Sequence, residues 1–263
     1  MKTNVQAKLS RAHAKPLTLG AVFVGLCLAG LSAQAYVISD NFDLVGTGRT
    51  NGATLNGTVT MTGGATWATN NGTFVFGGTG TNGYVSCSNV DYATAVVGLT
   101  SAATDIVNIQ AKMHPHGVGP WLGMQLGTAA GTGWDTGGLF MLVNGAPGNS
   151  GSIQVLANNV NIINFLVTDY TYDPNGFNLY SMTYNGMTQK FSLWANGTAL
   201  TTDYQLTVPY IPGTFVKAGL YDALNAAGEA SFDNFQVSVP EPAALALLAM
   251  GVLTLTIQRG RRG

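Results

Sequence analysis

The clearest structural signal in this sequence is the run Tyr180-Ser181-Met182-Thr183-Tyr184-Asn185-Gly186, followed by Phe191-Ser192-Leu193-Trp194-Ala195-Asn196-Gly197. In the first run large apolar side chains alternate with serine and threonine, and in the second Phe191 and Leu193 flank Ser192. This period of two is typical of a strand with one buried face. Each run ends in Asn-Gly, which accepts positive φ at both positions of a tight turn. The two runs therefore predict a β-hairpin.

Similar runs are spread through residues 36–239. Ile106–Met113 places its apolar side chains on one face and Asn108, Gln110 and Lys112 on the other. Turn signals separate the runs, because Asn-Gly pairs begin at Asn51, Asn56, Asn71, Asn82, Asn144, Asn175, Asn185 and Asn196. We expect further strands at Thr58–Thr62, Thr73–Phe76, Tyr84–Ser88, Trp121–Leu126, Leu139–Val143, Ile153–Ala157, Ile162–Val167, Val216–Tyr221 and Ser231–Val239. Many strands without an amphipathic helix predict an all-β sandwich or barrel.

The charge of residues 36–239 excludes one class of partner. This segment of 204 residues has four basic and eleven acidic residues, a net charge of −7, because most basic residues of the chain lie near its two ends. Nucleic-acid binding depends on neutralising phosphates with lysine and arginine, so we exclude it. Cys87 is the single cysteine of the segment, so no disulfide within it is expected.

Three features of this segment resemble the concanavalin A-like (laminin G-like) jelly roll. Asp40-Asn41-Phe42 opens the segment and Asp233-Asn234-Phe235 nearly closes it, as though the first and last strands lie side by side. The hairpin quoted above, with its Asn-Gly end, is the second feature. The third is Val216-Lys217-Ala218-Gly219-Leu220-Tyr221, which looks like a late inner strand. The resemblance implies a jelly-roll sandwich over the whole segment, without fixing an activity.

Two enzymes of that superfamily can be tested against the residues. A glucanase needs two carboxylates flanking the scissile bond, in a Glu-x-Asp-x-x-Glu pattern, but Glu229 is the single glutamate of the segment. Lys217-Ala218-Gly219-Leu220-Tyr221 is similar to the alginate-lyase Lys-Ala-Gly-x-Tyr segment, whose tyrosine is the catalytic acid/base. The lyase motifs Arg-x-Glu-x-Arg and Gln-Ile-His are missing, and Ile109-Gln110-Ala111-Lys112 is a poor substitute for the second. We expect no enzyme activity.

Binding residues are the remaining candidates. Trp67, Trp121, Trp134 and Trp194 could form a sugar-stacking platform, although tryptophans of a sandwich are usually core residues and at least two of the four should be buried. We expect Trp134 to be the exposed one, because it lies with Asp135 in a glycine- and threonine-rich loop whose polar side chains could hydrogen-bond sugar hydroxyls. The jelly-roll resemblance implies a structural calcium where the terminal strands meet, with Asp40, Asp43 and Asp233 as candidate ligands. The alternative is that these acids are solvated or form turns. His114 and His116 lack the further ligands that zinc requires, so we interpret them as a strand end.

Residues 1–35 are predicted to be a signal peptide. A basic start is followed by the apolar run Leu17–Leu31 and by Ala33-Gln34-Ala35, a small-x-small pattern. Signal peptidase is therefore expected to cut between Ala35 and Tyr36.

Residues 240–263 are predicted to be a second targeting segment. Pro240-Glu241-Pro242 precedes the apolar run Ala243–Ile257, and Arg259, Arg261 and Arg262 follow it. By length and charge this is a marginal transmembrane helix with its arginines in the cytoplasm. The order and spacing resemble the PEP-CTERM sorting signal. That resemblance implies cutting by an exosortase-type membrane protease and passage to the cell surface or exopolysaccharide matrix, with the tail as a transient inner-membrane anchor.

The sequence thus predicts a signal peptide (1–35), a β-sandwich domain (36–239) and a sorting tail (240–263). The function that we expect is a non-catalytic structural or adhesive role at the surface or in the matrix. The alternative is a lectin-like module, with or without calcium, that binds extracellular polysaccharide. A degenerate polysaccharide lyase is a minor alternative.

Overall fold

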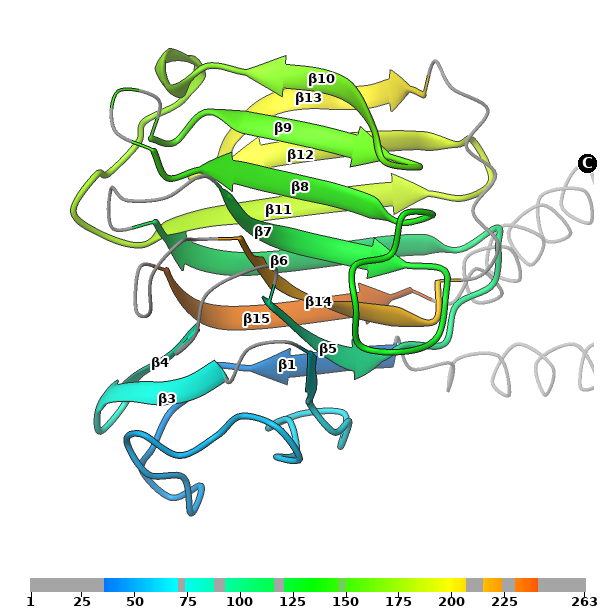
Figure 1. Cartoon of the computed structure of the whole chain (residues 1–263). Coiled ribbons are helices and arrows are strands. Elements are labelled where there is room, and N and C mark those ends of the chain that lie inside the picture. Colours follow the sequence, from blue (N-terminus) through cyan, green and yellow to red (C-terminus); the bar gives the residue numbers. More distant parts are fainter. Residues whose placement is uncertain are drawn as a thin grey trace, which may run out of the picture. The chain divides into compact units, whose positions relative to one another are not determined.

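The computed structural model describes residues 36–240, except 71–73, 88–92, 116–120, 147, 149, 207–214 and 224–229 (Figure 1). The described residues form two antiparallel sheets that enclose one hydrophobic core. The prediction of an all-β sandwich is confirmed. The predicted signal helix and tail helix lie outside the described residues. Within the described part, the one helical element is the 3₁₀ turn η2 (Val167–Asp169), and no helix is long and apolar enough to cross a membrane.

Sheet I has eight strands in the order β13-β12-β11-β6-β15-β4-β3, with β1 paired to β15 beside this path. Their bounds are β1 (Tyr36–Asp40), β3 (Phe74–Thr79), β4 (Asn82–Cys87), β6 (Ile106–His114), β11 (Asn178–Asn185), β12 (Lys190–Ala195), β13 (Thr198–Gln205) and β15 (Ser231–Val239). Sheet II has the order β10-β9-β8-β7-β14-β5-β2. Its strands are β2 (Ala68–Asn70), β5 (Ala93–Gly98), β7 (Trp121–Gly127), β8 (Leu139–Asn144), β9 (Ile153–Ala157), β10 (Val160–Phe165) and β14 (Lys217–Asp222).

The first and last described strands lie side by side, as expected. β1 pairs antiparallel with β15, so that Tyr36 lies opposite Val239 and Asp40 opposite Phe235. Both Asp-Asn-Phe motifs meet at Trp67, whose ring lies 5.8 Å from the ring of Phe42 and 5.0 Å from that of Phe235 between centroids. Both ends of the domain are thus held by one buried aromatic cluster.

Three strands, β2, β5 and β13, were not expected from the sequence, and one expected strand is absent. They escape the alternation criterion; β5, for example, has small side chains and is buried on both faces, so its residues do not alternate. The expected strand at Thr58–Thr62 is wrong, because this segment makes only the isolated bridges Val59–Thr66 and Ser39–Thr62. Glycine-rich turns interrupt the segment, and a strand would need a continuous partner.

The Asn-Gly pairs have several roles. Asn196 and Gly197 both have positive φ, at 48° and 80°, and form the predicted tight turn between β12 and β13. The turn between β9 and β10 uses Asn158-Asn159 instead, with φ of 50° and 59°. Asn82-Gly83 lies within β4 and is no turn. Asparagine tolerates the left-handed region even without a following glycine, so the dipeptide alone does not locate every hairpin.

Candidate functional site

The outer side of sheet II has an apolar centre, which is unusual because an antiparallel sheet commonly leaves its outer face polar and solvated. Here Phe140, Leu142, Tyr221 and Ala223 are buried in a second hydrophobic cluster, separate from the core between the sheets. Three half-buried side chains, Trp121, Trp134 and Leu156, pack against this cluster. Together with the buried Phe140, Leu142 and Tyr221 they form the surface that we call the aromatic face.

Strand register brings the aromatic face together. On β7, Leu122, Met124 and Leu126 point into the core, which leaves Trp121 and Gln125 for the opposite side. Gln125 lies opposite Phe140 of β8, and Trp121 lies opposite Asn144 at the other end of that strand. β14 contributes Tyr221 from the other side of β7. Residues about a hundred positions apart in sequence therefore share one surface.

The loop 128–138, between β7 and β8, lies across β14 (Figure 1). Trp134 in this loop stacks on Phe140 with 3.7 Å between ring centroids and an interplanar angle of 19°. Its ring also lies 4.5 Å from that of Tyr221. One side of the indole is thus packed on the sheet, while the side chain as a whole remains partly exposed.

Asp135 and Lys217 fix the shape of this loop. The buried Asp135 carboxylate accepts backbone N–H groups from Thr128, from Ala129 at 2.8 Å and from Gly137 at 3.0 Å. The Lys217 ammonium donates to the carbonyl oxygens of Gly131 at 3.0 Å and Gly133 at 2.9 Å. Both charged groups are therefore engaged with the loop backbone.

The pKa values of this pair follow from that environment. Burial by itself raises the pKa of Asp135, but the three backbone N–H groups and the charge of Lys217 outweigh it, so the pKa lies below its usual value of 3.8. Burial lowers the pKa of Lys217, and the charge of Asp135 partly offsets that shift. The carboxylate is thus ionised at neutral pH and is engaged in holding the loop that positions Trp134.

Gln125 is the unusual polar group of this face. Its side chain is fully buried, and neither its amide nitrogen nor its oxygen has a hydrogen-bond partner among the described residues. The neighbouring cross-strand positions are Phe140 and Gly219. A buried amide without a partner costs stability, so this residue is a target for substitution.

The lyase-like segment has a structural role in this arrangement. Tyr221 is 4 % exposed and packs against Trp134, and Lys217 is bound to the loop carbonyls. Gln110, the substitute considered for the lyase glutamine, lies on sheet I, whereas Gln125 lies on the strand beside Tyr221. Gln110 and Tyr221 therefore do not share one face of the sandwich.

The three candidate calcium ligands do not fit a calcium site. Asp40 is fully occupied: its two oxygens accept the Arg49 guanidinium at 2.6 and 2.7 Å, and they also accept the Trp67 indole N–H and the Phe42 backbone N–H. The side chain of Asp233 lies 3.9 Å from the Lys112 ammonium. No group of three acidic, histidine or cysteine side chains that could hold a metal occurs in the described part of the chain. Asp43 accepts a hydrogen bond from the Asn41 amide at 2.5 Å instead.

The remaining predicted residues fall mainly outside the described part. The residues outside the described part are Ala33, Ala35, His116, Glu241, Pro242, Arg259, Arg261 and Arg262. Tyr36 begins β1, and Pro240 directly follows β15. His114 ends β6, with its ring 5.9 Å from that of Phe177. The cleavage and sorting assignments of these residues stay predictions.

Trp121 was one of four tryptophans considered as a sugar-stacking surface, whereas Phe140 and Leu142 were not expected at the site. A signal was present, because Leu139–Val143 is apolar at every position, which is typical of a strand buried on both faces. The sequence did not indicate which segment covers the outer face of this strand. That segment is loop 128–138, whose path depends on the contacts of Asp135 and Lys217.

Comparison with known proteins gives structural likeness only. No protein-family model matches the sequence, and no curated protein gives a match. The structure is similar to the Emp47p carbohydrate recognition domain, with 13 % identity, 80 % of this chain and 98 % of that one covered and a TM-score of 0.48. It is also similar to a lectin from Bauhinia forficata in complex with GalNAc, at 11 % identity, 78 % and 98 % coverage and a TM-score of 0.48. A third is the VIP36 exoplasmic/lumenal domain in its Ca²⁺/Man3GlcNAc-bound form, at 10 % identity, 65 % and 82 % coverage and a TM-score of 0.41.

Proposed function

We propose that this protein is an exported, non-catalytic carbohydrate-binding module with a concanavalin A-like jelly-roll domain, and that sugar binds at the aromatic face of sheet II. The observation that carries the proposal is the apolar cluster on the outer side of that sheet, where Trp121 and Trp134 are only partly buried. An apolar patch with polar groups around it marks a binding site more often than a plain surface.

The chemistry of the aromatic face suits a sugar. A pyranose ring has an apolar C–H side that can stack on an indole, and hydroxyls around its rim. Beside the two tryptophans, Gln154 and Asn144 are half-buried on the same side of sheet II. Their amide groups can donate to and accept from hydroxyls. Asp135 would contribute indirectly, because its carboxylate holds the loop that carries Trp134.

Export and sorting belong to the same proposal. A signal peptide, a PEP-CTERM-like tail and an exosortase-type protease would deliver the domain to the cell surface or the exopolysaccharide matrix. Polysaccharide is abundant at that location, so a matrix role and sugar binding are compatible. A purely structural or adhesive role without sugar binding is the competing proposal.

Glycan-array binding of the purified protein tests the proposal. We expect binding that Trp121→Ala and Trp134→Ala each weaken by about tenfold or more, as for an aromatic anchor in a binding surface. Met187→Ala is the control, because that side chain is 71 % exposed in the turn between β11 and β12. A protein that binds no glycan would support the competing structural role. Binding that survives both tryptophan substitutions would place the sugar site away from the aromatic face and overturn the site proposed here.

A further inference from the structure

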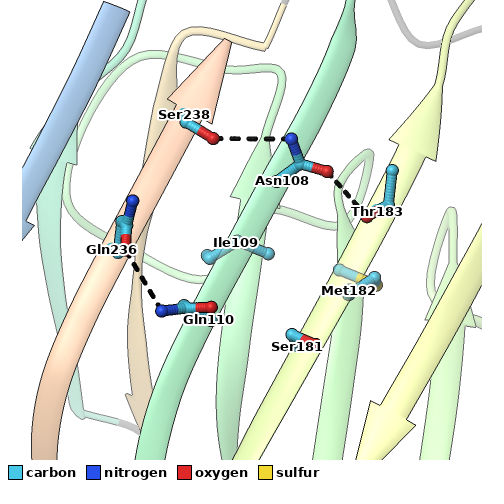
Figure 2. A pocket seen from close by; sticks show the side chains of 8 residues that line it. All are labelled: Asn108, Ile109, Gln110, Ser181, Met182, Thr183, Gln236 and Ser238. Carbon is cyan, nitrogen blue, oxygen red and sulfur yellow. Dashed lines mark hydrogen bonds between the residues drawn. The ribbon is translucent and has the colours of Figure 1, made fainter. Parts of the chain in front are cut away.

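The outer face of sheet I differs from the aromatic face because it is polar throughout its centre. On β6 the buried side chains alternate with half-buried polar ones. The neighbouring strands β11 and β15 place serine, threonine and glutamine at matching register. We call this strip the amide groove (Figure 2), and its residues are Asn108, Gln110, Ser181, Thr183, Gln236 and Ser238.

Hydrogen bonds across the strands fix the orientation of the side chains in the amide groove. The Gln110 amide nitrogen donates to the Gln236 oxygen at 3.1 Å. The Asn108 amide donates to the Ser238 hydroxyl at 3.4 Å and accepts from the Thr183 hydroxyl at 2.6 Å (Figure 2). The Gln110 oxygen, the Gln236 amide nitrogen and the Ser181 hydroxyl then have no hydrogen-bond partner among the described residues. Donors and acceptors therefore face outward from positions that are already ordered.

The amide groove is hollowed, and the hollow continues along β6. One depression of about 200 Å³ lies over Asn108, Gln110 and Thr183. A second, of about 250 Å³, shares Gln110 and Gln236 with the first and extends to Lys112 and Asn234. The second lies where the pairing of β15 with β6 shifts register between Asp233 and Gln236. A bulge of this kind bends the strand and turns side chains aside, which opens the surface.

Charge is nearly absent from the hydrogen-bonding surface of this hollow. Lys112 lies 3.9 Å from Asp233, and Asp40, at the far edge, is paired with Arg49. The domain around the hollow has a net charge of −7. An anionic polysaccharide would be repelled by this negative charge, because the described part of the hollow has no cluster of cations to neutralise it. An uncharged ligand with many hydroxyls would find amides and hydroxyls as partners and would not be repelled.

Trp194 adds an aromatic side chain beside the amide groove. It is half-buried on β12, directly opposite Ser181, and its neighbours Leu193 and Ala195 point into the core. A protein partner would need several apolar anchors at the centre of its interface. Besides this ring, the described part of the hollow has one exposed apolar side chain, Leu179, which is 37 % exposed. Two separate apolar groups are few for the centre of a protein interface, so polysaccharide suits the surface better than protein.

We infer that the amide groove is a second binding surface, independent of the aromatic face, which takes a neutral linear polysaccharide along β6. The two surfaces lie on the outer sides of opposite sheets. One molecule can then hold two chains and cross-link them, which raises the avidity for a polysaccharide network without new contacts. This role goes beyond binding sugar at a single face.

Affinity electrophoresis of the purified protein tests this inference. The gels contain a neutral polysaccharide (a β-1,3-glucan, a galactomannan or dextran) or anionic alginate. We expect retardation by at least one neutral polymer, and we expect Gln110→Ala/Gln236→Ala to weaken it about tenfold, the effect of losing two hydrogen-bonding groups. Both side chains are half-buried and lose one mutual hydrogen bond, so the thermal unfolding midpoint should fall by no more than a few degrees. The parent should also aggregate the soluble neutral polymer at intermediate ratios, and the double variant should not.

The outcomes separate the two surfaces. Trp121→Ala tests the aromatic face and should leave the retardation that depends on Gln110 and Gln236 in place. If the double variant is retarded and aggregates the polymer like the parent, the inference is wrong even when Trp121→Ala shows sugar binding at the aromatic face. Stronger retardation by alginate, lost in the double variant, would overturn the choice of a neutral ligand. Retardation by no polymer at all would contradict both surfaces.

Discussion

The indole N–H of Trp67 donates a 2.9 Å hydrogen bond to the carboxylate of Asp40, and both side chains are almost completely buried. The same carboxylate accepts hydrogen bonds from the two terminal guanidinium nitrogens of Arg49. The central carbon of that guanidinium lies 4.9 Å from the centroid of the Phe76 ring. Asp40 ends β1, and Trp67 precedes β2. This group therefore ties the long segment between the two strands to the first strand of the domain.

Asp40→Asn should destabilise the domain strongly. The asparagine can still accept from Trp67, but Arg49 loses its counter-charge while its side chain is 6 % exposed. Breaking one side of a buried ion pair costs about 3–5 kcal/mol, a large part of the free energy of unfolding of a typical domain. Urea denaturation monitored by tryptophan fluorescence measures the loss.

A double variant shows whether the cost arises from the pair. Asp40→Asn/Arg49→Met removes both charges, so its free energy of unfolding should be higher than that of Asp40→Asn alone. Equal or lower stability of the double variant would show that the ion pair is not the source of the loss.

Metal removal should leave the domain unchanged. Asp40 is occupied by Arg49 and Trp67, and Asp233 lies beside Lys112, so these acids have little capacity left for a cation. The thermal midpoint should therefore agree within about 1 °C in EDTA and in millimolar calcium chloride, since a ligand that does not bind the folded state cannot stabilise it. A calcium-dependent rise in the midpoint that Asp43→Ala abolishes would contradict this expectation.

The alternation of side chains explains how much of the fold could be predicted. β6, β11 and β12 alternate clearly, because one face of each meets the core and the other meets solvent. β5 and β8 are buried on both faces and lose that signal. The pairing of β1 with β15 was suggested by the repeated Asp-Asn-Phe motif, but the meeting of both phenylalanines at Trp67 was not, since it depends on the path of the segment 41–67.

The binding surfaces were harder to predict for a related reason. Asn108 and Gln110 were recognised as a polar face of one strand, yet a groove requires β15, more than a hundred residues later, at a particular register. Trp134 was recognised as a loop residue, but its stacking on Phe140 depends on a loop closed by backbone N–H groups around Asp135. Backbone contacts of this kind leave no pattern in side-chain types.

Asp135 should make the domain sensitive to acid. Its pKa in the folded state is below the usual 3.8, so the carboxylate contributes full stability above about pH 4 and loses it as the pH falls through the folded-state pKa. Asp135→Asn should lower the free energy of unfolding at pH 7 by about 1–3 kcal/mol, because charge-assisted hydrogen bonds to backbone N–H groups are lost. As the pH falls below about 4, the difference between variant and parent should shrink. Denaturant titrations from pH 2 to pH 7 measure both effects.

Asp233 provides a contrast within the same experiment. Burial raises its pKa, with Asp43 and Asp40 adding to the shift and Asn234 and Lys112 opposing it. Its folded state therefore takes up a proton more readily than the unfolded chain, and its contribution grows as the pH falls. Asp233→Asn should thus show a more favourable effect at pH 7 than at pH 3. The same pH trend for both variants would contradict the two assignments.

Cell fractionation with intact-mass measurement tests the proposed processing. We expect a product that begins at Tyr36, lacks Arg259, Arg261 and Arg262 and is found at the surface or in the matrix. Arg261→Ala/Arg262→Ala should slow the removal of the tail, because the arginine cluster is part of the sorting signal that the tail resembles. A product that keeps its arginines in the inner membrane would exclude sorting, while leaving both binding surfaces to be tested separately.

Gln125→Met should leave the domain equally stable or stabilise it. The buried amide has no hydrogen-bond partner among the described residues, and it lies between Phe140 and Gly219 on a largely apolar face. Replacing such a group by an apolar one of similar shape removes a desolvation cost, so a gain of up to about 1–2 kcal/mol in the free energy of unfolding is expected. The matched control is Gln154→Met, half-buried on the same face, where the change should be near zero. A loss of more than about 1 kcal/mol at Gln125 alone would contradict this expectation. It would mean that a buried water molecule hydrogen-bonds to the Gln125 amide in solution.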